Sequence, residues 1–479
     1  MSVDLLTKFL ELMSKKVTES DLELIQLGKS LGLDLVSFAD LRASQEDEFV
    51  DEVREKALYR MQEEKDNYLQ YNDYFYAGSI DFMVSNEPEG KRFFLLETNG
   101  GSHRGLSILS KKQQKILYNG YLEAISQAII NNKREDNKIF VLVGVPINDS
   151  LIHEKIIMVE YLRKNLKEKQ HAVKIFNADN FDGTFEAEVI FLIADYRQLT
   201  TYLTFSQNWV IYNGEKVDVL IGDGIARRLN NHKFINLIKK NIRKLNTIIV
   251  NPIFLITDDK SLTYLASYYN KKKLTKYNLK YLLFTKAYNE EDLINKIEFL
   301  LKEYKQSFII KPSGGSGGAG VMPISEFEKP SDIRKIIKES KNEFYTKFMK
   351  TRNPFPYTIQ EKADFSLIDW KGGKHTYDLR IYLAQNNKKI IPIGGLVRIS
   401  RDSFISGLNK QEFVVNLSGY NGQIEVERGI GFSKRTCEIL NLTSEDFINM
   451  FCIGCVLFKG MVQNYKKIVK FSNWDKILV

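Results

Sequence analysis

The sequence predicts a mixed α/β fold, of the α+β kind, with two or three domains. Strand-like and helix-like segments alternate between about residues 138 and 250, which is typical of parallel β/α units. Two short apolar runs are separated by Asn86, Pro88 and Gly90, which predicts a β-hairpin. A further strand-like run leads directly into a glycine-rich loop. The chain has 479 residues, 43% of them hydrophobic, so it can bury a sizeable core.

The first part of the chain reads as helix followed by the hairpin. Residues 1–75 are interpreted as a helical N-terminal segment, because leucines recur there at helical spacing and residues 49–72 have the pattern of a long charged helix. The hairpin strands are expected at residues 80–84 and 93–96, and a helix is expected at 111–131.

Residues 136–250 have a different sequence pattern, in which strand-like and helix-like segments alternate. The elements expected there are a strand at 140–145, a helix at 152–169, and strands at 173–176 and 188–193. This alternation predicts a small Rossmann-like domain. It contains no GxGxxG motif, so a nicotinamide site is not indicated.

Residues 251–479 form the last predicted unit. Thr257–Asp259 reads as an N-cap and acidic turn before a helix at 260–269. The final helix is expected at 444–462. Strands are expected at 308–311, 358–360, 378–384, 390–399 and 412–417.

The formal net charge is +9, and a basic balance can indicate nucleic acid or a membrane surface as partner. Here the lysines are spread along the whole chain, and no nucleic-acid fold signature is present. Residues 1–16 lack the apolar core of a signal peptide, and no apolar run approaches the ~18 residues of a membrane helix. We therefore expect a cytoplasmic protein with no nucleic-acid or membrane partner. The sequence does not indicate which oligomeric state the protein has.

The cysteines are Cys437, Cys452 and Cys455, too few for a chain built on disulfides. Cys452 and Cys455 form a CxxC inside an apolar stretch that reads as a buried helix, and no second Cys or His pair follows at zinc spacing. We interpret them as structural thiols, with a redox or metal site as the alternative.

The strongest local signal is the stretch FIIKPSGGSGGAGVMPI, residues 308–324. Lys311 ends a strand, and a loop rich in glycine follows, which can bend tightly and bring its N–H groups close to an anion. It is not a Walker A loop, because no GK[ST] closes it. A flexible surface turn is the alternative. The strand-borne lysine favours a lid over phosphates.

Two weaker signals indicate nucleotide binding only when they are considered together with this loop. Lys260, at a helix start, can supply a second cation for the same triphosphate, although a lone lysine is usually solvated. In YTIQEKAD, residues 357–364, a hinge strand can hold adenine, and Glu361 and Asp364 are placed to bind the ribose hydroxyls. Solvated acids at a strand end are the alternative.

Charged residues also lie on or beside strands that are expected to be central. Asp378, Arg380 and Arg398 are in such positions, where a charge is costly unless it is paired or used. Arginine suits bidentate contact with phosphate and carboxylate. A purely structural Asp378–Arg380 pair is the alternative.

The hairpin carries a possible metal site. Glu97 and Asn99 are two residues apart on one strand and so face the same way, and Asp81 lies on the partner strand. Two carboxylates and an amide oxygen suit Mg²⁺. Incidental surface acids are the alternative, but the flanking apolar runs FFLL and IDFMV argue against it.

Together these motifs resemble the ATP-grasp superfamily. In the usual ATP-grasp order the lysine and glycine-rich loop come before the Asp…Glu-x-Asn hairpin, whereas here the hairpin comes first. This order resembles the circularly permuted ATP-grasp families, which include the synthetase domain of glutathionylspermidine synthetase. The similarity covers most of the chain and extends to the segments VDVLIGDGIARRLNNHKF, NTIIVNPIFLITDDKSLTYL and TYDLRIYLAQ…GGLVRIS…VVNLSGYNG.

The resemblance implies a circularly permuted ATP-grasp fold with ATP and Mg²⁺ as cofactors. Residues 76–135 would carry the metal-binding hairpin, 136–250 the pre-ATP-grasp domain and 251–479 the nucleotide-binding part. A permuted domain would also require the hairpin, residues 80–99, to join the same sheet as residues 378–383 and 395–399, with the final helix packed beside it. The implied metal ligands are Asp81, Glu97 and Asn99. The residues implied to face the reacting phosphoryl group are Arg380, Arg398 and Asn416. The implied ATP-binding residues are Lys260, Lys311, Ser313, Gly314, Gly315, Ser316, Gly317, Gly318, Gln360, Glu361 and Asp364.

The implied activity is an ATP-dependent carboxylate–amine ligase that works through an acyl phosphate and releases ADP. Its partners would be a small-molecule carboxylic acid and an amine, such as an amino acid, a peptide or a polyamine. Ser79 stands where glutathionylspermidine synthetase has a basic residue, and the chain has no amidase domain, which counts against spermidine and glutathione. A kinase and a non-catalytic nucleotide-binding protein on the same fold are the alternatives.

Overall fold

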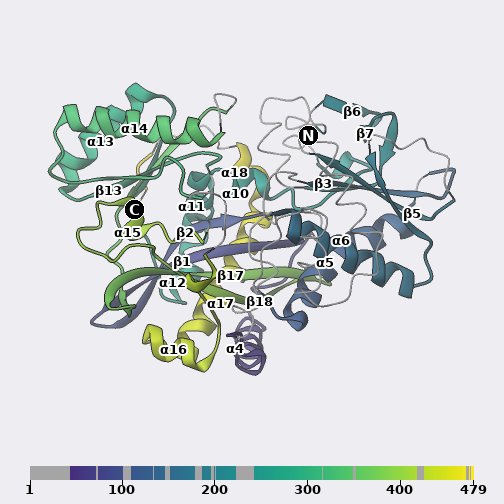
Figure 1. Cartoon of the computed structure of the whole chain (residues 1–479), viewed down its shortest axis with the longest axis horizontal. Helices are drawn as coiled ribbons and strands as arrows, with labels where there is room; N and C mark the ends of the chain where they lie inside the picture. Colours follow the sequence, from purple (N-terminus) through teal and green to yellow (C-terminus); the bar gives the residue numbers. More distant parts are fainter. Residues whose placement is uncertain are drawn as a thin grey trace.

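The computed structural model is a mixed α/β structure in which three of its four sheets follow one another along the long axis (Figure 1). The expected helices in residues 1–43, and Ser316, lie outside the described residues. The structure describes residues 44–71, 74–100, 109–132, 134–145, 151–178, 186–195, 199, 201–222, 242–315, 317–348, 352–417, 425–470, 474 and 476–478.

The central sheet has seven strands and contains the predicted hairpin. β1 and β2 pair antiparallel, and β1 also pairs with β17, with Asp81 opposite Arg380. These two residues are 299 positions apart in the sequence. The prediction that the hairpin joins the sheet of the later strands is confirmed. The strand order is β11 (Leu279–Lys280), β2 (Gly90–Asn99), β1 (Ala77–Glu87), β17 (Gly373–Asn386), β18 (Lys389–Ile399) and β19 (Gly429–Gly431), with β16 (Leu367–Trp370) paired to β17.

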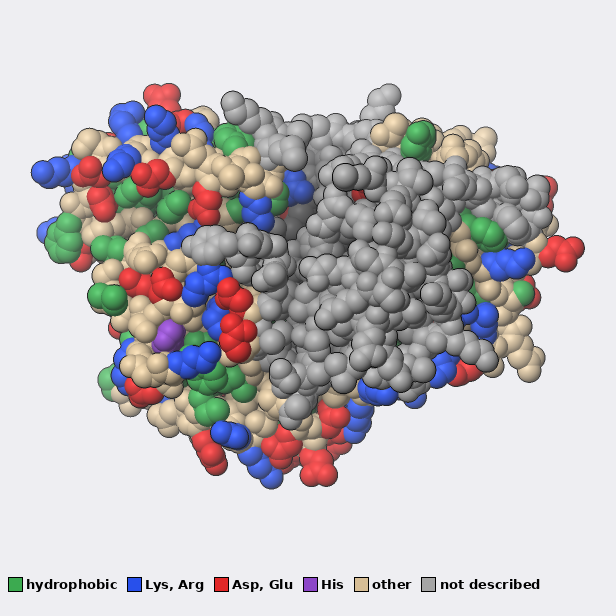
Figure 2. Space-filling view, in the orientation of Figure 1, with side chains coloured by type: hydrophobic (Ala, Val, Ile, Leu, Met, Phe, Trp, Pro, Cys, Tyr) green, Lys and Arg blue, Asp and Glu red, His purple; other side chains and the backbone are tan. Residues whose placement is uncertain are grey.

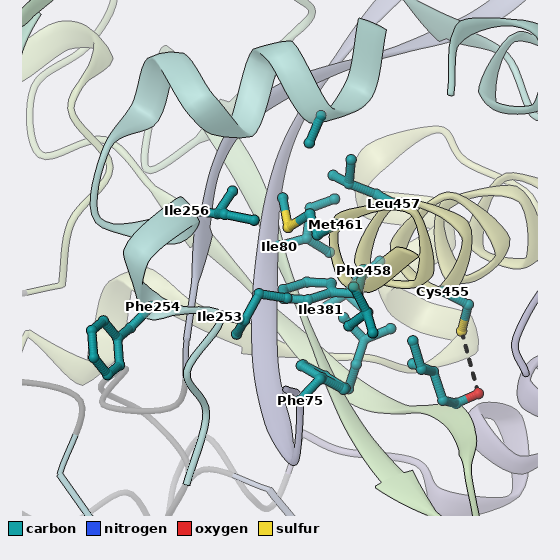
Figure 3. Packing of buried hydrophobic residues seen from close by; sticks show 14 of the residues in the cluster. Phe75, Ile80, Ile253, Phe254, Ile256, Ile381, Cys455, Leu457, Phe458 and Met461 are labelled. Carbon is teal, nitrogen blue, oxygen red and sulfur yellow. Dashed lines mark hydrogen bonds between the residues drawn. The ribbon is translucent and has the colours of Figure 1, made fainter. Parts of the chain in front are cut away.

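Helix α17 (Ser444–Gln463) supports one face of the central sheet. Thr443 and Asp446 form the capping box that starts it. Its side chains Phe458 and Met461 join Ile80 of β1 and Ile381 of β17 in one hydrophobic cluster (Figure 3). The prediction that the final helix packs beside the hairpin is therefore confirmed.

Cys452 and Cys455 lie on this helix and are free, fully buried thiols. The Cys455 thiol donates to the carbonyl oxygen of Ile390 at 3.7 Å (Figure 3). Burial raises the pKa of Cys452 to about 12, so this thiol stays protonated at neutral pH. The two cysteines behave as small apolar core residues.

Helix α4 (Asp47–Arg60) lies beside α17, with the rings of Phe49 and Phe447 5.5 Å apart. The expected long helix at 49–72 is wrong in its length, because the chain turns after Arg60. Lys65 adopts a left-handed backbone with φ of 50°, and Asp66 is buried in contact with Lys273. That ion pair fixes the turn. The short helix α16 (Lys434–Leu440) lies between β19 and α17 in the chain.

Helix α5 (Lys111–Ile130) covers the opposite face of the central sheet. Leu117 and Tyr121 of this helix share a second hydrophobic cluster with Tyr382 and Ala384 of β17. Successive β17 side chains thus enter different cores, as the pleat requires. Because both faces are covered, the strands are buried along most of their length.

The second sheet is five-stranded and entirely parallel. Its order is β10 (Ile248–Ile249), β9 (Val219–Ile221), β3 (Ile139–Val145), β5 (Val189–Asp195) and β4 (Val173–Asn177). Helix α6 (Leu151–Glu168) connects β3 to β4, so the predicted parallel β/α unit is confirmed. A small antiparallel sheet follows, with β6 (Leu203–Ser206), β7 (Trp209–Tyr212) and β8 (Glu215–Val217), before the short helix η3 (Ile242–Lys244).

The remaining sheet has four antiparallel strands, with α13 (Glu290–Tyr304) and α14 (Pro330–Phe348) packed on it (Figure 1). Its order is β12 (Phe284–Ala287), β15 (Tyr357–Glu361), β13 (Phe308–Pro312) and β14 (Met322–Ile324). Near the end of the chain, Leu478 exchanges backbone hydrogen bonds with Phe284 of β12. The short helices α10 (Phe254–Thr257), α11 (Lys260–Tyr269) and α12 (Lys271–Thr275) lie between β10 and β11 in the chain, and α18 (Tyr465–Lys470) follows α17.

The strand expected at 412–417 is wrong. The chain instead forms the one-turn helix α15 (Lys410–Phe413), whose N-cap Asn409 accepts a hydrogen bond from the Gln411 N–H. The Glu412 carboxylate accepts three backbone N–H groups, from residues 405–407, which ties the preceding loop to this turn. A second short helix, η5 (Val426–Arg428), precedes β19. Among the described helices, none is long and apolar enough to cross a membrane.

Candidate active site

Four charged side chains form a buried network in the central sheet. Arg380 donates from Nε and Nη2 to both carboxylate oxygens of Asp81, at 2.7 and 2.6 Å. Arg398 donates from Nη2 to Asp81 Oδ2 at 2.7 Å and from Nε to Asp378 Oδ1 at 2.8 Å. All four side chains are 10% exposed or less. The structural pair considered from the sequence is wrong in its partner, because Asp378 pairs with Arg398.

Burial makes this network sensitive to the loss of any member. Burial raises the pKa of Asp378 to about 6, although Arg398 acts in the opposite direction. Burial lowers the pKa of Arg398, but Asp378 and Asp81 outweigh it, and the net pKa is raised well above its ordinary value. Removing one partner of such a network leaves an uncompensated buried charge, which is strongly destabilising.

Glu97 extends the network toward solvent. It lies opposite Asp81 on the hairpin, and its side chain is 31% exposed. Its Oε2 is 3.0 Å from Lys260 Nζ, and its Oε1 is 3.7 Å from Arg380 Nη2. Burial raises the pKa of Glu97, but Lys260 and Arg380 outweigh it and hold the pKa well below its usual range. Glu97 is therefore a carboxylate at neutral pH.

Asn99 is next on the same face of β2. Its Nδ2 donates to the Ser79 hydroxyl at 3.3 Å. Since the amide nitrogen is used there, the amide oxygen remains the group suited to a cation.

Lys260 is the first residue of α11. The Asp259 side chain caps this helix by accepting the Ser261 N–H at 3.0 Å, as the sequence predicts. Tyr264 lies one turn further along and so shares the helix face of Lys260. It was not among the predicted site residues, and this i, i+4 spacing is the signal that would have found it.

Lys311 lies near the end of β13, one residue before its last residue Pro312, and its Nζ is buried. It donates to Gln360 Oε1 at 2.6 Å and to the Tyr264 hydroxyl at 2.9 Å. Burial lowers the pKa of Lys311 to about 7; Lys260 lowers it further and Glu97 opposes the shift. Lys311, Lys260 and Glu97 therefore lie close enough to influence one another, although they come from three distant segments.

The glycine-rich loop follows Lys311 and turns through left-handed backbone at four glycines. Its entry is fixed by the Ser313 N–H, which donates to the carbonyl oxygens of Pro354 and Pro356 at 3.0 Å, and by the Gly314 N–H, which donates to Asp258 at 3.3 Å. A Cβ on Gly315 would lie 3.3 Å from the Ala319 carbonyl oxygen, within the loop itself.

The far side of the loop meets the predicted residue Asn416 and two residues that the sequence did not single out, Lys347 and Val414. A Cβ on Gly317 would lie 2.5 Å from Lys347 Nζ and 2.8 Å from Asn416 Nδ2, so the predicted residue Asn416 does lie at the loop. A Cβ on Gly318 would lie 2.7 Å from Val414. The α15 turn and the end of α14 thus form the support of the loop.

Glu343 of α14 joins the loop to α15. Its Oε2 accepts the Gly320 N–H at 3.1 Å, and its Oε1 forms an ion pair with Lys410. Burial lowers the pKa of Lys410, and Lys260 contributes to the same direction. Lys260, Lys347 and Lys410 therefore lie near the loop in addition to Lys311.

Gln360, predicted to bind ATP, and Glu361 and Asp364, predicted to hold the adenosine, have different environments. Gln360 is 3% exposed and is held by Lys311. Glu361 Oε2 accepts the Leu283 N–H at 2.9 Å, so one of its oxygens is used within the sheet. Asp364 is exposed to solvent.

The side chains expected to bind Mg²⁺ are Asp81, Glu97 and Asn99. Within the described ranges, no three Asp, Glu, His or Cys side chains come together as a metal site. Glu97 and Asn99 fit, because Mg²⁺ is commonly bound by one or two carboxylates together with substrate phosphates and water. Asp81 fits poorly, because both of its oxygens already accept guanidinium N–H groups.

No family model and no curated protein matches this chain. Among solved structures, it is similar to a glutathione synthetase-like effector from Globodera pallida, with 14% identity and a TM-score of 0.38, over 75% of this chain and 81% of that one. It is also similar to the D-alanine–D-alanine ligase of Coxiella burnetii, with 8% identity and a TM-score of 0.26, over 70% of this chain and 99% of that one. The VanG D-Ala:D-Ser ligase of Enterococcus faecalis has 9% identity and a TM-score of 0.27, over 67% of this chain and 99% of that one.

Proposed function

We propose that this protein is an ATP-dependent carboxylate–amine ligase with a circularly permuted ATP-grasp fold. The observation that carries the proposal is the convergence of Lys260, Lys311 and the glycine-rich loop with the carboxylates and arginines of the central sheet. In this proposal the hairpin belongs to the same ATP-grasp domain as residues 251–479. The parallel sheet of residues 136–250 is the Rossmann-like pre-ATP-grasp domain.

The nucleotide would lie between the four-stranded sheet and the central sheet. Lys260 and Lys311 hold the phosphates, and the loop from Ser313 to Gly318 closes over them with its backbone N–H groups. Gln360, Glu361 and Asp364 hold the adenosine. Phosphate oxygens beside Lys311 stabilise its charged form, which is otherwise disfavoured by burial.

Glu97 and Asn99 are the residues that would hold Mg²⁺ with the nucleotide phosphates. The ion, when bound, neutralises charge on the transferring phosphoryl group. Asp81, the third ligand that the resemblance implies, is instead occupied by two arginines.

The reaction would begin when a substrate carboxylate attacks the γ-phosphorus of ATP and ADP leaves. The amine then attacks the acyl carbon of the acyl phosphate, the carbon–oxygen bond to phosphate breaks, and an amide, phosphate and a proton are released. Positioning and charge stabilisation dominate such chemistry. Arg380 and Arg398, already fixed by carboxylates, can donate to the developing negative charge, and Asn416 can donate from the loop side.

The acyl phosphate must be kept from water, and the glycine-rich loop serves as the lid. The partners are a small-molecule acid and an amine. Basic and acidic side chains intermingle over the described part of the face in Figure 2, which supports small substrates over a nucleic acid.

The test is ADP release from ATP with pooled amino acids, peptides and polyamines, followed by mass spectrometry of the products. A ligase releases ADP only when both an acid and an amine are present and forms a product lighter than their sum by one water. Release with one substrate and a stable phosphorylated product would indicate a kinase. Binding of ATP without turnover would indicate a non-catalytic nucleotide-binding protein.

The matched variant is Lys311→Ala. Losing a phosphate contact that strengthens in the transition state should cost ~2–4 kcal/mol, or about 30- to 1,000-fold in kcat/KM. Near-normal ADP release by this variant would show that the nucleotide site has been placed wrongly.

A further inference from the structure

Both carboxylate oxygens of Asp81 are engaged by guanidinium groups. Oδ1 accepts from Arg380, and Oδ2 accepts from Arg380 and from Arg398, all within 2.6–2.7 Å. Asp81 is 1% exposed. An ionised carboxylate has about four acceptor sites, so these three guanidinium N–H contacts leave little capacity for another ligand.

Glu97 has a different environment, although it lies opposite Asp81 on the same hairpin. Its side chain is 31% exposed, and its nearest cation is the flexible Lys260 at 3.0 Å. A lysine can move aside as a point charge, whereas a bidentate guanidinium–carboxylate pair is fixed in its geometry. A cation therefore reaches Glu97 more readily than Asp81.

A Mg²⁺ ion on Asp81 would also meet strong repulsion. To reach the ~2.0–2.1 Å that Mg²⁺ requires, it would have to displace a guanidinium or lie beside two of them. Displacement would leave a buried arginine without its carboxylate, which is the costly outcome for a buried ion pair.

We propose that Asp81 is a positioning residue that holds Arg380 and Arg398, and that the Mg²⁺ site is built from Glu97 and Asn99 without it. The inference rests on the proposed function for the identity of the nucleotide. Asp81 links three strands, because it lies on β1 and binds side chains of β17 and β18. Arg398 has a second anchor in Asp378, whereas Asp81 supplies the bidentate contact of Arg380.

This arrangement keeps two cationic groups aimed at the reaction site before substrate binds. Donors that are fixed in advance cost no reorganisation when charge develops, and a displacement of about 1 Å can cost about 100-fold in rate. Asp81 acts through the arginines and does not itself touch substrate.

The experiment compares D81N, E97Q and D378N with the wild type. The probe is Mn²⁺, measured by electron paramagnetic resonance in the presence of the ATP analogue AMP-PNP. We expect D81N to change Mn²⁺ affinity by less than about threefold and E97Q to weaken it at least about tenfold, since even indirect partners of a metal ion contribute 10- to 100-fold. D378N, which disturbs Arg398 without approaching the metal site, is the matched control and should behave like D81N.

A second readout separates positioning from metal binding. In ADP release, D81N should lower kcat about 100-fold at an unchanged Mg²⁺ requirement. E97Q should raise the Mg²⁺ concentration needed for half-maximal rate. If D81N loses Mn²⁺ affinity as much as E97Q, and excess Mg²⁺ restores its kcat, Asp81 is a metal ligand and the inference is wrong.

A crystal structure of the wild type with Mn²⁺ and AMP-PNP keeps the inference testable if D81N does not fold. The expected result is an anomalous peak at Glu97 and Asn99, with both arginines still on Asp81. A peak within about 2.2 Å of an Asp81 oxygen would overturn it. A wild type that binds neither AMP-PNP nor Mn²⁺ would overturn the proposed function as well, which distinguishes the two failures.

Discussion

Lys311 is a buried cation whose two hydrogen-bond partners are neutral side chains. Gln360 and Tyr264 accept its N–H groups, and burial lowers its pKa to about 7 from an ordinary value of 10.5. A lysine in this situation destabilises the nucleotide-free protein. Such a cost is typical of functional sites, where a group is placed for a ligand that is still to arrive.

The pH dependence of stability should show this cost. Between pH 7 and 10.5 the unfolded chain holds a proton on this lysine that the folded protein has lost, so the free energy of unfolding rises with pH across that window. The destabilisation of the folded protein by the buried Lys311 charge is therefore greatest below pH 7. Lys311→Met should raise the free energy of unfolding at pH 6 by about 1–3 kcal/mol after the lost hydrogen bonds are counted, and the gain should fade toward pH 10. Urea unfolding at pH 6, 8 and 10 measures it.

Lys286→Met is the matched control. Lys286 is also buried, on β12 of the same sheet, but it is 2.6 Å from the Asp259 carboxylate. Removing it leaves Asp259 without its ion pair, so this variant should lose stability across the range. If Lys311→Met also destabilised the protein equally at pH 6 and pH 10, the buried-charge account of Lys311 would fail.

Sequence reasoning identified the type and strand position of Lys311 but not its partners. The strand and the glycines around it are local signals, which a short window contains. Tyr264 and Gln360 come from other elements, and the sharing of Asp81 by two arginines depends on strand register. Such contacts follow from tertiary packing, so the individual charges were predictable and their pairing was not.

At the scale of elements, the glycine-rich loop depends on conformations that other residues adopt at a cost. Gly317 has φ of +61°, and a Cβ there would lie 2.8 Å from Asn416 Nδ2. Gly317→Ala should therefore weaken nucleotide affinity about tenfold, because left-handed backbone costs roughly 1–2 kcal/mol for a residue with a side chain. Isothermal titration with AMP-PNP and Mg²⁺ measures this affinity.

Gly214→Ala is the control for backbone strain alone. Gly214 also has positive φ, at +88°, but a Cβ there would meet open space in the β7–β8 turn. It should lose some stability and keep its nucleotide affinity. Unchanged affinity in Gly317→Ala would mean that the loop does not have to keep this shape around the nucleotide.

The two errors in element prediction have the same cause. The segment 412–417 has apolar residues suited to a strand, but Glu412 binds three backbone N–H groups of the preceding loop and closes a turn. The segment after Arg60 has a helical pattern, but the chain turns there, and the buried Asp66 carboxylate pairs with Lys273. In both cases a charged side chain with a specific partner overrode local propensity.

At the scale of the whole molecule, the order of motifs along the chain predicted which segments meet. The hairpin and β17 are separated by the parallel sheet in sequence, yet they pair in the central sheet (Figure 1). Helix α17, near the other end of the chain, packs on β1. Periodicity could not have predicted this arrangement, because it requires knowing which strands share a sheet. The resemblance to a permuted family supplied that expectation.

The last prediction concerns coupling between these distant segments. If the hairpin and the glycine-rich loop bind one nucleotide, both should lose backbone mobility together when it arrives. Hydrogen–deuterium exchange with AMP-PNP and Mg²⁺ should slow in peptides covering residues 93–100 and 308–320, with the same dependence on nucleotide concentration. Peptides of β3 and β5 in the parallel sheet should not change, which makes them an internal control.

Lys311→Ala should abolish both effects at nucleotide concentrations that saturate the wild type, since it removes a phosphate contact on only one of the two segments. Slowing confined to the loop, with exchange in the hairpin unaltered, would separate the metal-binding hairpin from the nucleotide and contradict a single permuted ATP-grasp site.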